Sequence, residues 1–297
     1  MRVTFGMTMN SAMADVNATA QRLAGTQLEV SSGLRVRVPS DDPAATVVAI
    51  GQQTEIGALQ QYSNTASAAT SKLSVTDSVL SDMVTQLTAA KSSAASVLVS
   101  TVTPSQMQGA VMQLQSIRDA LVSDFNTQYQ GSYIFSGSKA TTQPFTETAG
   151  VVSAYQGDAS PVSVNIDRQI TVPTSLDGGQ IAQGSAATDV FTDISNLITA
   201  IQANDTTGIN TGMTNLDAAF NRVVSAQTGV GISLQTLQAQ QSRLTSAQQA
   251  ATTQLSKAQD ANMAQAISDM TSAETANRAA LGAVATINKV SLLDYIG

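Results

Sequence analysis

The stretch MAQAISDMTSAETANRAALGAV, residues 263–284, indicates the fold of the whole chain. Its larger apolar residues recur in helical steps, with two polar residues at intervening positions of the same line. This spacing is typical of a narrow coiled-coil seam and differs from the broad apolar face of a helix in a globular core. A long helix with such a seam needs a partner helix. The seam consists of Met263, Ile267, Met270, Glu274, Asn277, Leu281 and Val284.

The start of the chain contains a second stripe that offers this partner. Its residues also alternate in steps of three and four. We therefore predict that the two ends of the chain pair as an antiparallel coiled coil, with the remaining residues looped out between them. Periodicity leaves open the alternative that both are ordinary surface helices of a bundle. The stripe consists of Met9, Met13, Val16, Ala20, Leu23, Gln27 and Val30.

The apolar residues of the two stripes and of the last turns form a predicted assembly interface. Because the seams are narrow and partly polar, residues 1–40 and 255–297 should be mobile in a dilute monomer, and brief proteolysis should leave a fragment near 44–250. The predicted interface contains Met9, Met13, Val16, Leu23, Val30, Met263, Ile267, Met270, Leu281, Val284, Ile287, Leu292 and Leu293.

A connector follows the first stripe. Gly33 can end a helix, Pro39 keeps the preceding residue out of the helical region, and Asp42 before Pro43 is a typical start of a new helix. Asp41 beside Asp42 could also be a catalytic pair, but adjacent residues at a helix start rarely converge on one substrate. We therefore interpret the connector as structural.

The middle of the chain predicts long helices interrupted by one β-rich insertion. An unbroken rhythm of three and four runs from Leu59 to Val97, and a second helix follows the break at Thr103-Pro104. Short β-branched and aromatic runs between turn residues then indicate strands. Helical patterning returns near Asp189 and is interrupted at residues 229–231. Since the insertion lies outside every seam, we expect the helical body to fold without it.

The predicted fold class is therefore mainly α with an inserted β-rich domain, in an elongated nested architecture. The terminal helices pair as a coiled coil and a bundle of long helices forms the middle. The predicted segments are an N-terminal assembly helix and connector (1–43), a first helical body (44–131), the β-rich insertion (132–186), a second helical body (187–254) and a C-terminal assembly helix (255–297).

Composition argues against most catalytic and nucleic-acid functions. The chain of 297 residues has 14 basic and 21 acidic residues, and it lacks Cys, His and Trp. Without His and Cys, the usual general base and zinc ligands are missing, so neither an enzyme, a metal nor a cofactor is expected. Scattered basic residues and few aromatics argue against binding to nucleic acid. Neither a membrane span nor a cleavable signal peptide is predicted.

One enzymatic alternative remains, a hydrolase that uses the carboxylates of Asp158 and Asp167. We interpret both as turn and strand-edge residues. Charged residues make up only 12% of the chain, and a weakly charged surface suits self-association better than free solubility.

Specific strings of this sequence resemble the flagellin superfamily. SSGLR (31–35) followed by DDPA (41–44) is similar to the passage between the first two helices of that family. Further strings resemble the junction proteins of the superfamily more than its filament-forming flagellins. These strings are GSYIFSG (131–137) with TQPF (142–145), MAQAISDMT (263–271) with ETA (274–276), and the ending SLLDYIG (291–297).

The resemblance implies a structural protein of the bacterial flagellum that forms the junction ring between hook and filament; a filament-forming flagellin is the alternative. It implies self-association in a ring and contacts with the first hook–filament junction protein and with flagellin or the filament cap protein. It also implies an export chaperone, type III export without a cleaved signal peptide, and an extracellular location.

Overall fold

The computed structural model describes residues 5–98, 102–148 and 150–296, with side chains described for residues 6–286 within these ranges. It divides into a terminal unit, residues 1–58 and 247–297, and a central unit, residues 59–246. The helices are α1 (Phe5–Ser32), α2 (Pro43–Ser96), α3 (Pro104–Phe125), α4 (Gly178–Ala182), α5 (Val190–Gln202), α6 (Thr206–Gln259) and α7 (Met263–Ile296). The long helices α2 and α6 contribute residues to both units.

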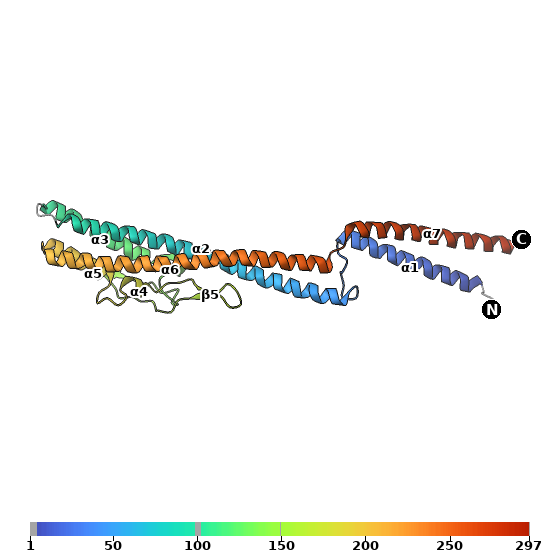
Figure 1. Cartoon of the computed structure of the whole chain (residues 1–297), viewed down its shortest axis with the longest axis horizontal. Coiled ribbons are helices and arrows are strands. Elements are labelled where there is room, and N and C mark those ends of the chain that lie inside the picture. The colour runs from blue at the N-terminus through green and yellow to red at the C-terminus, as the bar shows by residue number, and fades with distance from the viewer. Residues whose placement is uncertain (1–4, 99–101, 149, 297) are drawn as a thin grey trace. The chain divides into compact units, whose positions relative to one another are not determined.

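In the terminal unit, α1 and α7 lie side by side and run antiparallel (Figure 1). Thr19 Oγ1 lies 3.2 Å from Asn277 Oδ1, and Leu34 forms an antiparallel bridge with Asp260. From the first contact to the second, the residue number rises from 19 to 34 on the N-terminal segment and falls from 277 to 260 on the C-terminal segment. The predicted pairing of the two ends is confirmed.

The C-terminal helix begins later than predicted. Residues 255–259 belong to the end of α6, and α7 begins at Met263. The break between α6 and α7 lies where residues 259–261 bind the connector that follows α1. Ala261 N donates to Gly33 O at 2.8 Å, and Arg35 N donates to Gln259 O at 2.8 Å. Asn262 then starts α7 by accepting a hydrogen bond from Gln265 N at 3.4 Å.

In the central unit, α2 and α6 run antiparallel. Gln241 Nε2 donates to Ser67 Oγ at 2.7 Å, and Lys91 forms an ion pair with Asp217 farther along both helices. The predicted rhythm of α2 is confirmed as the buried face of this helix. Except for half-buried Tyr62, every residue of the rhythm is buried: Leu59, Ala66, Ala69, Leu73, Thr76, Leu80, Met83, Leu87, Ala90, Ala94 and Val97.

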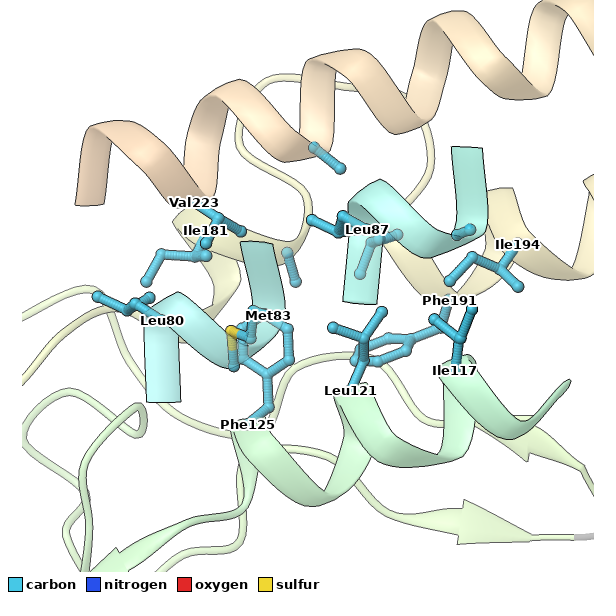
Figure 2. Packing of buried hydrophobic residues seen from close by; sticks show 14 of the residues in the cluster. Leu80, Met83, Leu87, Ile117, Leu121, Phe125, Ile181, Phe191, Ile194 and Val223 are labelled. Carbon is cyan, nitrogen blue, oxygen red and sulfur yellow. The ribbon is translucent and has the colours of Figure 1, made fainter. Parts of the chain in front are cut away.

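The central core brings together helices α2 to α6 (Figure 2). Leu80, Met83 and Leu87 of α2 face Leu121 and Phe125 of α3 in this cluster. Ile181 of α4, Phe191 of α5 and Val223 of α6 complete it. The start of α3 is fixed by a capping box between Thr103 and Gln106, as the predicted break at Thr103-Pro104 requires.

The β-rich insertion and the residues just before it contain three separate two-stranded antiparallel sheets in the described part of the chain. They pair β1 (Gln128–Tyr129) with β2 (Ser132–Tyr133), β3 (Glu147–Thr148) with β4 (Val151–Val152), and β5 (Ser163–Asn165) with β6 (Thr171–Pro173). The strands are shorter than the sequence patterns indicated. Most of the insertion consists of loops and turns.

The insertion is part of the hydrophobic core, which argues against the expectation that the helical body folds without it. Phe135 and Phe145 are buried, and their rings lie 5.6 and 5.2 Å from the ring of Phe125 on α3. Phe145 also contacts Phe191 of α5, with ring centroids 4.9 Å apart. The insertion thus supplies two large aromatic side chains to the hydrophobic cluster that the helices form.

The predicted interruption at residues 229–231 is wrong, because α6 continues through Gly229 and Gly231. Val230 between them is buried against the core, whereas both glycines are exposed. Packing of the neighbouring apolar residues therefore outweighs the weak helix propensity of the two glycines. The real break in this region lies earlier, between α5 and α6, where Asn204 adopts φ of 52°.

Candidate assembly surface

Large apolar side chains on the described surface are concentrated in the terminal unit. Ten of the fourteen exposed large hydrophobic residues belong to it, although it is the smaller of the two units. Its buried hydrophobic residues in the described ranges are Val36 and four alanines. The terminal unit therefore buries little apolar surface of its own and presents much of it to solvent.

The seam between α1 and α7 is formed mainly by small and medium side chains. On α7, Ala266 and Ala273 are buried, and the seam continues through half-buried Asn277 and Ala280. The sequence prediction missed these alanines because it built the α7 seam on Met263, Ile267 and Met270, which lie on a neighbouring line of the helix. Their spacing of seven residues was the available signal. The residues on the α1 side are Met9, Ala12, Val16, Thr19, Leu23, Thr26 and Val30.

The predicted interface residues fall into two groups. One group lies half-buried in the seam between the helices and consists of Met9, Val16, Leu23, Val30, Met270 and Val284. The other is exposed beside the seam and consists of Met13, Met263, Ile267 and Leu281. The side chains of Ile287, Leu292 and Leu293 lie outside the described residues.

A second exposed apolar patch lies at the connector and the start of α2. It consists of Val38, Val47, Val48 and Ile50, of which Val47 is 72% exposed. The sequence prediction did not include these residues. Three apolar residues lie close together in the first turns of the helix, and this cluster was the available signal. Without a partner stripe, however, the sequence does not show whether such a cluster is exposed or buried.

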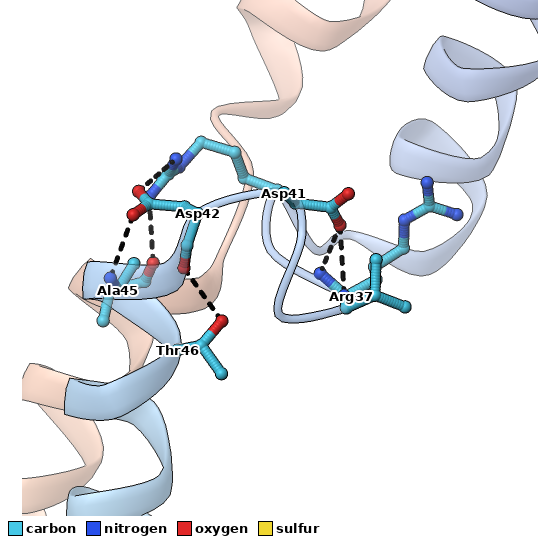
Figure 3. A network of polar contacts seen from close by, with 8 residues as sticks. Arg37, Asp41, Asp42, Ala45 and Thr46 are labelled. Atoms are coloured by element: carbon cyan, nitrogen blue, oxygen red, sulfur yellow. Dashed lines mark hydrogen bonds and ion pairs between the residues drawn. The ribbon is translucent and has the colours of Figure 1, made fainter.

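Figure 3 shows the polar network that fixes the connector. Asp41 Oδ2 accepts hydrogen bonds from Arg37 N at 3.0 Å and Val38 N at 3.1 Å. Asp42 Oδ1 accepts from Ala45 N at 3.0 Å and caps α2, as predicted. These backbone donors lower the pKa of both carboxyls, and the Arg35 guanidinium lowers the pKa of Asp42 further. Asp41 and Asp42 thus act as loop and helix caps.

Arg35 links the connector to the end of α6 within the terminal unit. Its guanidinium donates to Asp42 Oδ2 and to Ala258 O of α6, both at 3.1 Å. Gly33, with φ of 71°, ends α1 in a left-handed conformation that suits glycine. The SSGLR and DDPA strings therefore hold the connector against the end of α6.

The hydrolase alternative finds no support in the positions of Asp158 and Asp167. Asp158 Oδ1 accepts from Ser138 N at 2.7 Å, and Asp167 Oδ2 accepts from Gln240 Nε2 at 2.7 Å. Asp158 ties two loops of the insertion together, and Asp167 ties the insertion to α6. In the described part of the chain, the side chains form no group of three or more acidic residues that could hold a metal ion, and no helix there could cross a membrane.

Paired terminal helices, two long antiparallel helices and an exposed apolar surface together define a helical structural protein. The comparisons with known proteins agree with this class. A model of the bacterial flagellin N-terminal helical region matches residues 4–140, and a model of the bacterial flagellin C-terminal helical region matches residues 213–296. The chain belongs to the flagellin superfamily.

Two curated relatives are flagellar hook-associated proteins 3. The protein of Escherichia coli is 26% identical over 287 residues, which cover 89% of this chain and 90% of that protein. The protein of Salmonella typhimurium is 29% identical over 182 residues, which cover 61% of this chain and 56% of that protein. A putative flagellar hook-associated protein from Vibrio parahaemolyticus has a similar fold, with a TM-score of 0.70 and 20% identity, covering 74% of this chain and 100% of that one.

Proposed function

We propose that this chain is a structural protein of the bacterial flagellum that forms the junction ring between hook and filament. The observation that carries the proposal is the concentration of exposed apolar side chains in the terminal unit. Its two curated relatives bear the name hook-associated protein 3, which supports the position at the junction.

We propose that the exposed apolar residues of the terminal unit provide two different contact surfaces for neighbouring subunits. One lies beside the α1–α7 seam and includes Met13, Ile267 and Leu281; the other includes Val47 and Ile50. A ring built from head-to-tail contacts needs two different surfaces on each copy. The proposed interface is therefore the predicted set extended by the connector patch.

The proposed partners are further copies of this chain, the first hook–filament junction protein on one side, and flagellin or the filament cap protein on the other. An export chaperone would cover the apolar surface before assembly. The protein would leave the cell through the flagellar type III apparatus and act outside it. We propose no enzymatic role, since the acidic side chains considered as catalytic act as caps and tethers.

Immunogold labelling of isolated hook–filament complexes tests the position. We expect a single band at the junction. Label along the whole filament would instead identify a filament-forming flagellin. A second test incubates the purified chain under salting-out conditions, alone and with purified first junction protein. Long filaments formed by the chain alone would contradict the junction assignment.

A further inference from the structure

Gln86 of α2 and Asp124 of α3 form a polar contact at the edge of the apolar core. Gln86 Nε2 donates to Asp124 Oδ2 at 2.9 Å. Gln86 Oε1 is buried, and it has no hydrogen-bond partner within the described part of the chain. A buried carbonyl oxygen without a partner destabilises the folded state, so this half-completed pair needs an explanation.

The charges around this pair leave Asp124 without a counter-ion among the described residues. Asp82, one turn before Gln86 on α2, is acidic and repels a charge on Asp124. Arg118, the cation on α3, binds Asp119, Glu147 and the carbonyl of Gly150. On α5, which also packs against α3, the charged residue is Asp193, held by Thr188 and Asn215.

We propose that Gln86 and Asp124 form a proton-dependent latch between α2 and α3, which closes when Asp124 takes up a proton from solvent. A carboxylic acid and a primary amide can share two hydrogen bonds. The acid O–H donates to the amide oxygen while the amide N–H donates to the acid carbonyl oxygen. The carboxylate has no proton to donate, and this leaves Gln86 Oε1 unpaired. The neutral acid satisfies both groups.

The environment of Asp124 favours the neutral acid. Burial, which is the largest cause, and the charge of Asp82 raise the pKa of Asp124 to about 6, against a lowering by the Gln86 hydrogen bond. Because this pKa lies above that of an unfolded Asp, near 3.8, the native state binds more protons between these values. The latch therefore contributes fully below the lower pKa, and its contribution is lost as the pH rises through about 6.

Carbon-detected NMR of the full-length chain tests the latch without any substitution. We expect the carboxyl carbon of Asp124 to titrate with a midpoint near 6 and the side-chain carbonyl carbon of Gln86 to shift with the same midpoint. An Asp124 midpoint at or below about 4, or a Gln86 carbonyl that does not follow Asp124, overturns the proposal.

Thermal unfolding of an Asp124→Asn variant gives an independent test. The new amide reproduces the neutral acid, because its N–H can donate to Gln86 Oε1 while its oxygen accepts from Gln86 Nε2. At about pH 7.5 we expect the variant to melt roughly 2–4 °C above the natural chain; near pH 5 the gain should be smaller, and the two should converge only below about 3.8, the pKa of the unfolded Asp. In a Gln86→Met background the gain should shrink. A variant that melts below the natural chain at both pH values, or a gain that is independent of Gln86, contradicts the latch.

Discussion

At the scale of single residues, different side chains of α7 pair with α1 and face solvent, although they are neighbours in the sequence. Ala266 and Ala273 are buried against α1, and alanine lets two helices approach closely. Ile267 and Leu281 are large and are 48% and 52% exposed, so about half of each residue's surface is left uncovered by this pairing. The large residues are therefore available to another surface, and the small ones hold the helix pair together.

Replacing Leu281 with Asp tests this separation. Since Leu281 is 52% exposed, the monomer should melt within about 1–2 °C of the natural chain. In the assembled ring an unpaired charge would meet an apolar neighbour, so the variant should fail to enter the junction. Differential scanning calorimetry and immunogold labelling give the two readouts.

The matched control is Ala273→Asp, which places the charge inside the seam. This variant should lose helical signal even as a monomer, because Ala273 is only 4% exposed. If Leu281→Asp lowers the melting temperature by several degrees and still assembles, Leu281 belongs to the fold and not to the interface.

Phe135 shows at the same scale how a loop residue joins the core. Truncation to Ala should lower the free energy of unfolding by roughly 3–5 kcal/mol, since the ring is fully buried against Phe125. Urea unfolding monitored by circular dichroism measures the loss. Val151→Ala, at an exposed position of the same insertion, should change it by no more than about 0.5 kcal/mol. If Phe135→Ala lowers the free energy of unfolding no more than Val151→Ala does, the insertion folds independently of the helical body.

At the scale of elements, α6 is continuous because buried residues on one side outweigh two glycines on the other. Val230 and Leu237 fix this face against the core, while nothing lies within 4 Å of a side chain added at Gly229 or Gly231. The glycines therefore cost helix stability without relieving a steric clash.

Replacing Gly229 or Gly231 with Ala should raise the free energy of unfolding by roughly 0.5–1 kcal/mol for each substitution. Chemical denaturation of the monomer measures the gain. The control is Gly208→Ala, whose new Cβ would lie 2.8 Å from Ala200 Cβ and should bring no gain. Destabilisation by Gly229→Ala would mean that α6 needs a flexible point there.

At the scale of the whole molecule, stability and exposed apolar surface belong to different units. The central unit contains the hydrophobic cluster that runs from Ala66 to Leu237. In the terminal unit the described buried residues are mostly alanine. Burial of apolar area is the main favourable term in folding, so the terminal unit should open at much lower cost.

Limited proteolysis of the dilute monomer should therefore trim the terminal helices, and the division into units narrows the expected fragment from about 44–250 to about 59–246. Mass spectrometry of the fragment gives its ends, and hydrogen exchange gives the local opening free energies. Protection of α1 and α7 equal to that of Leu73–Leu87 in the monomer would contradict the division.

The sequence by itself determined the periodic elements. The seam of α2, the pairing of the two ends and the cap at Asp42 follow from local spacing and helix-start chemistry, which depend on neighbours a few residues away. Tertiary structure alone decided where α6 ends, because Gln259 meets the connector at Arg35, more than two hundred residues distant. It also decided that Phe135 and Phe145 complete the helical core and that Leu281 lies outside the seam. These outcomes depend on which individual side chains meet after folding, and periodicity, which indicates only that a helix has a partner-seeking face, does not decide that.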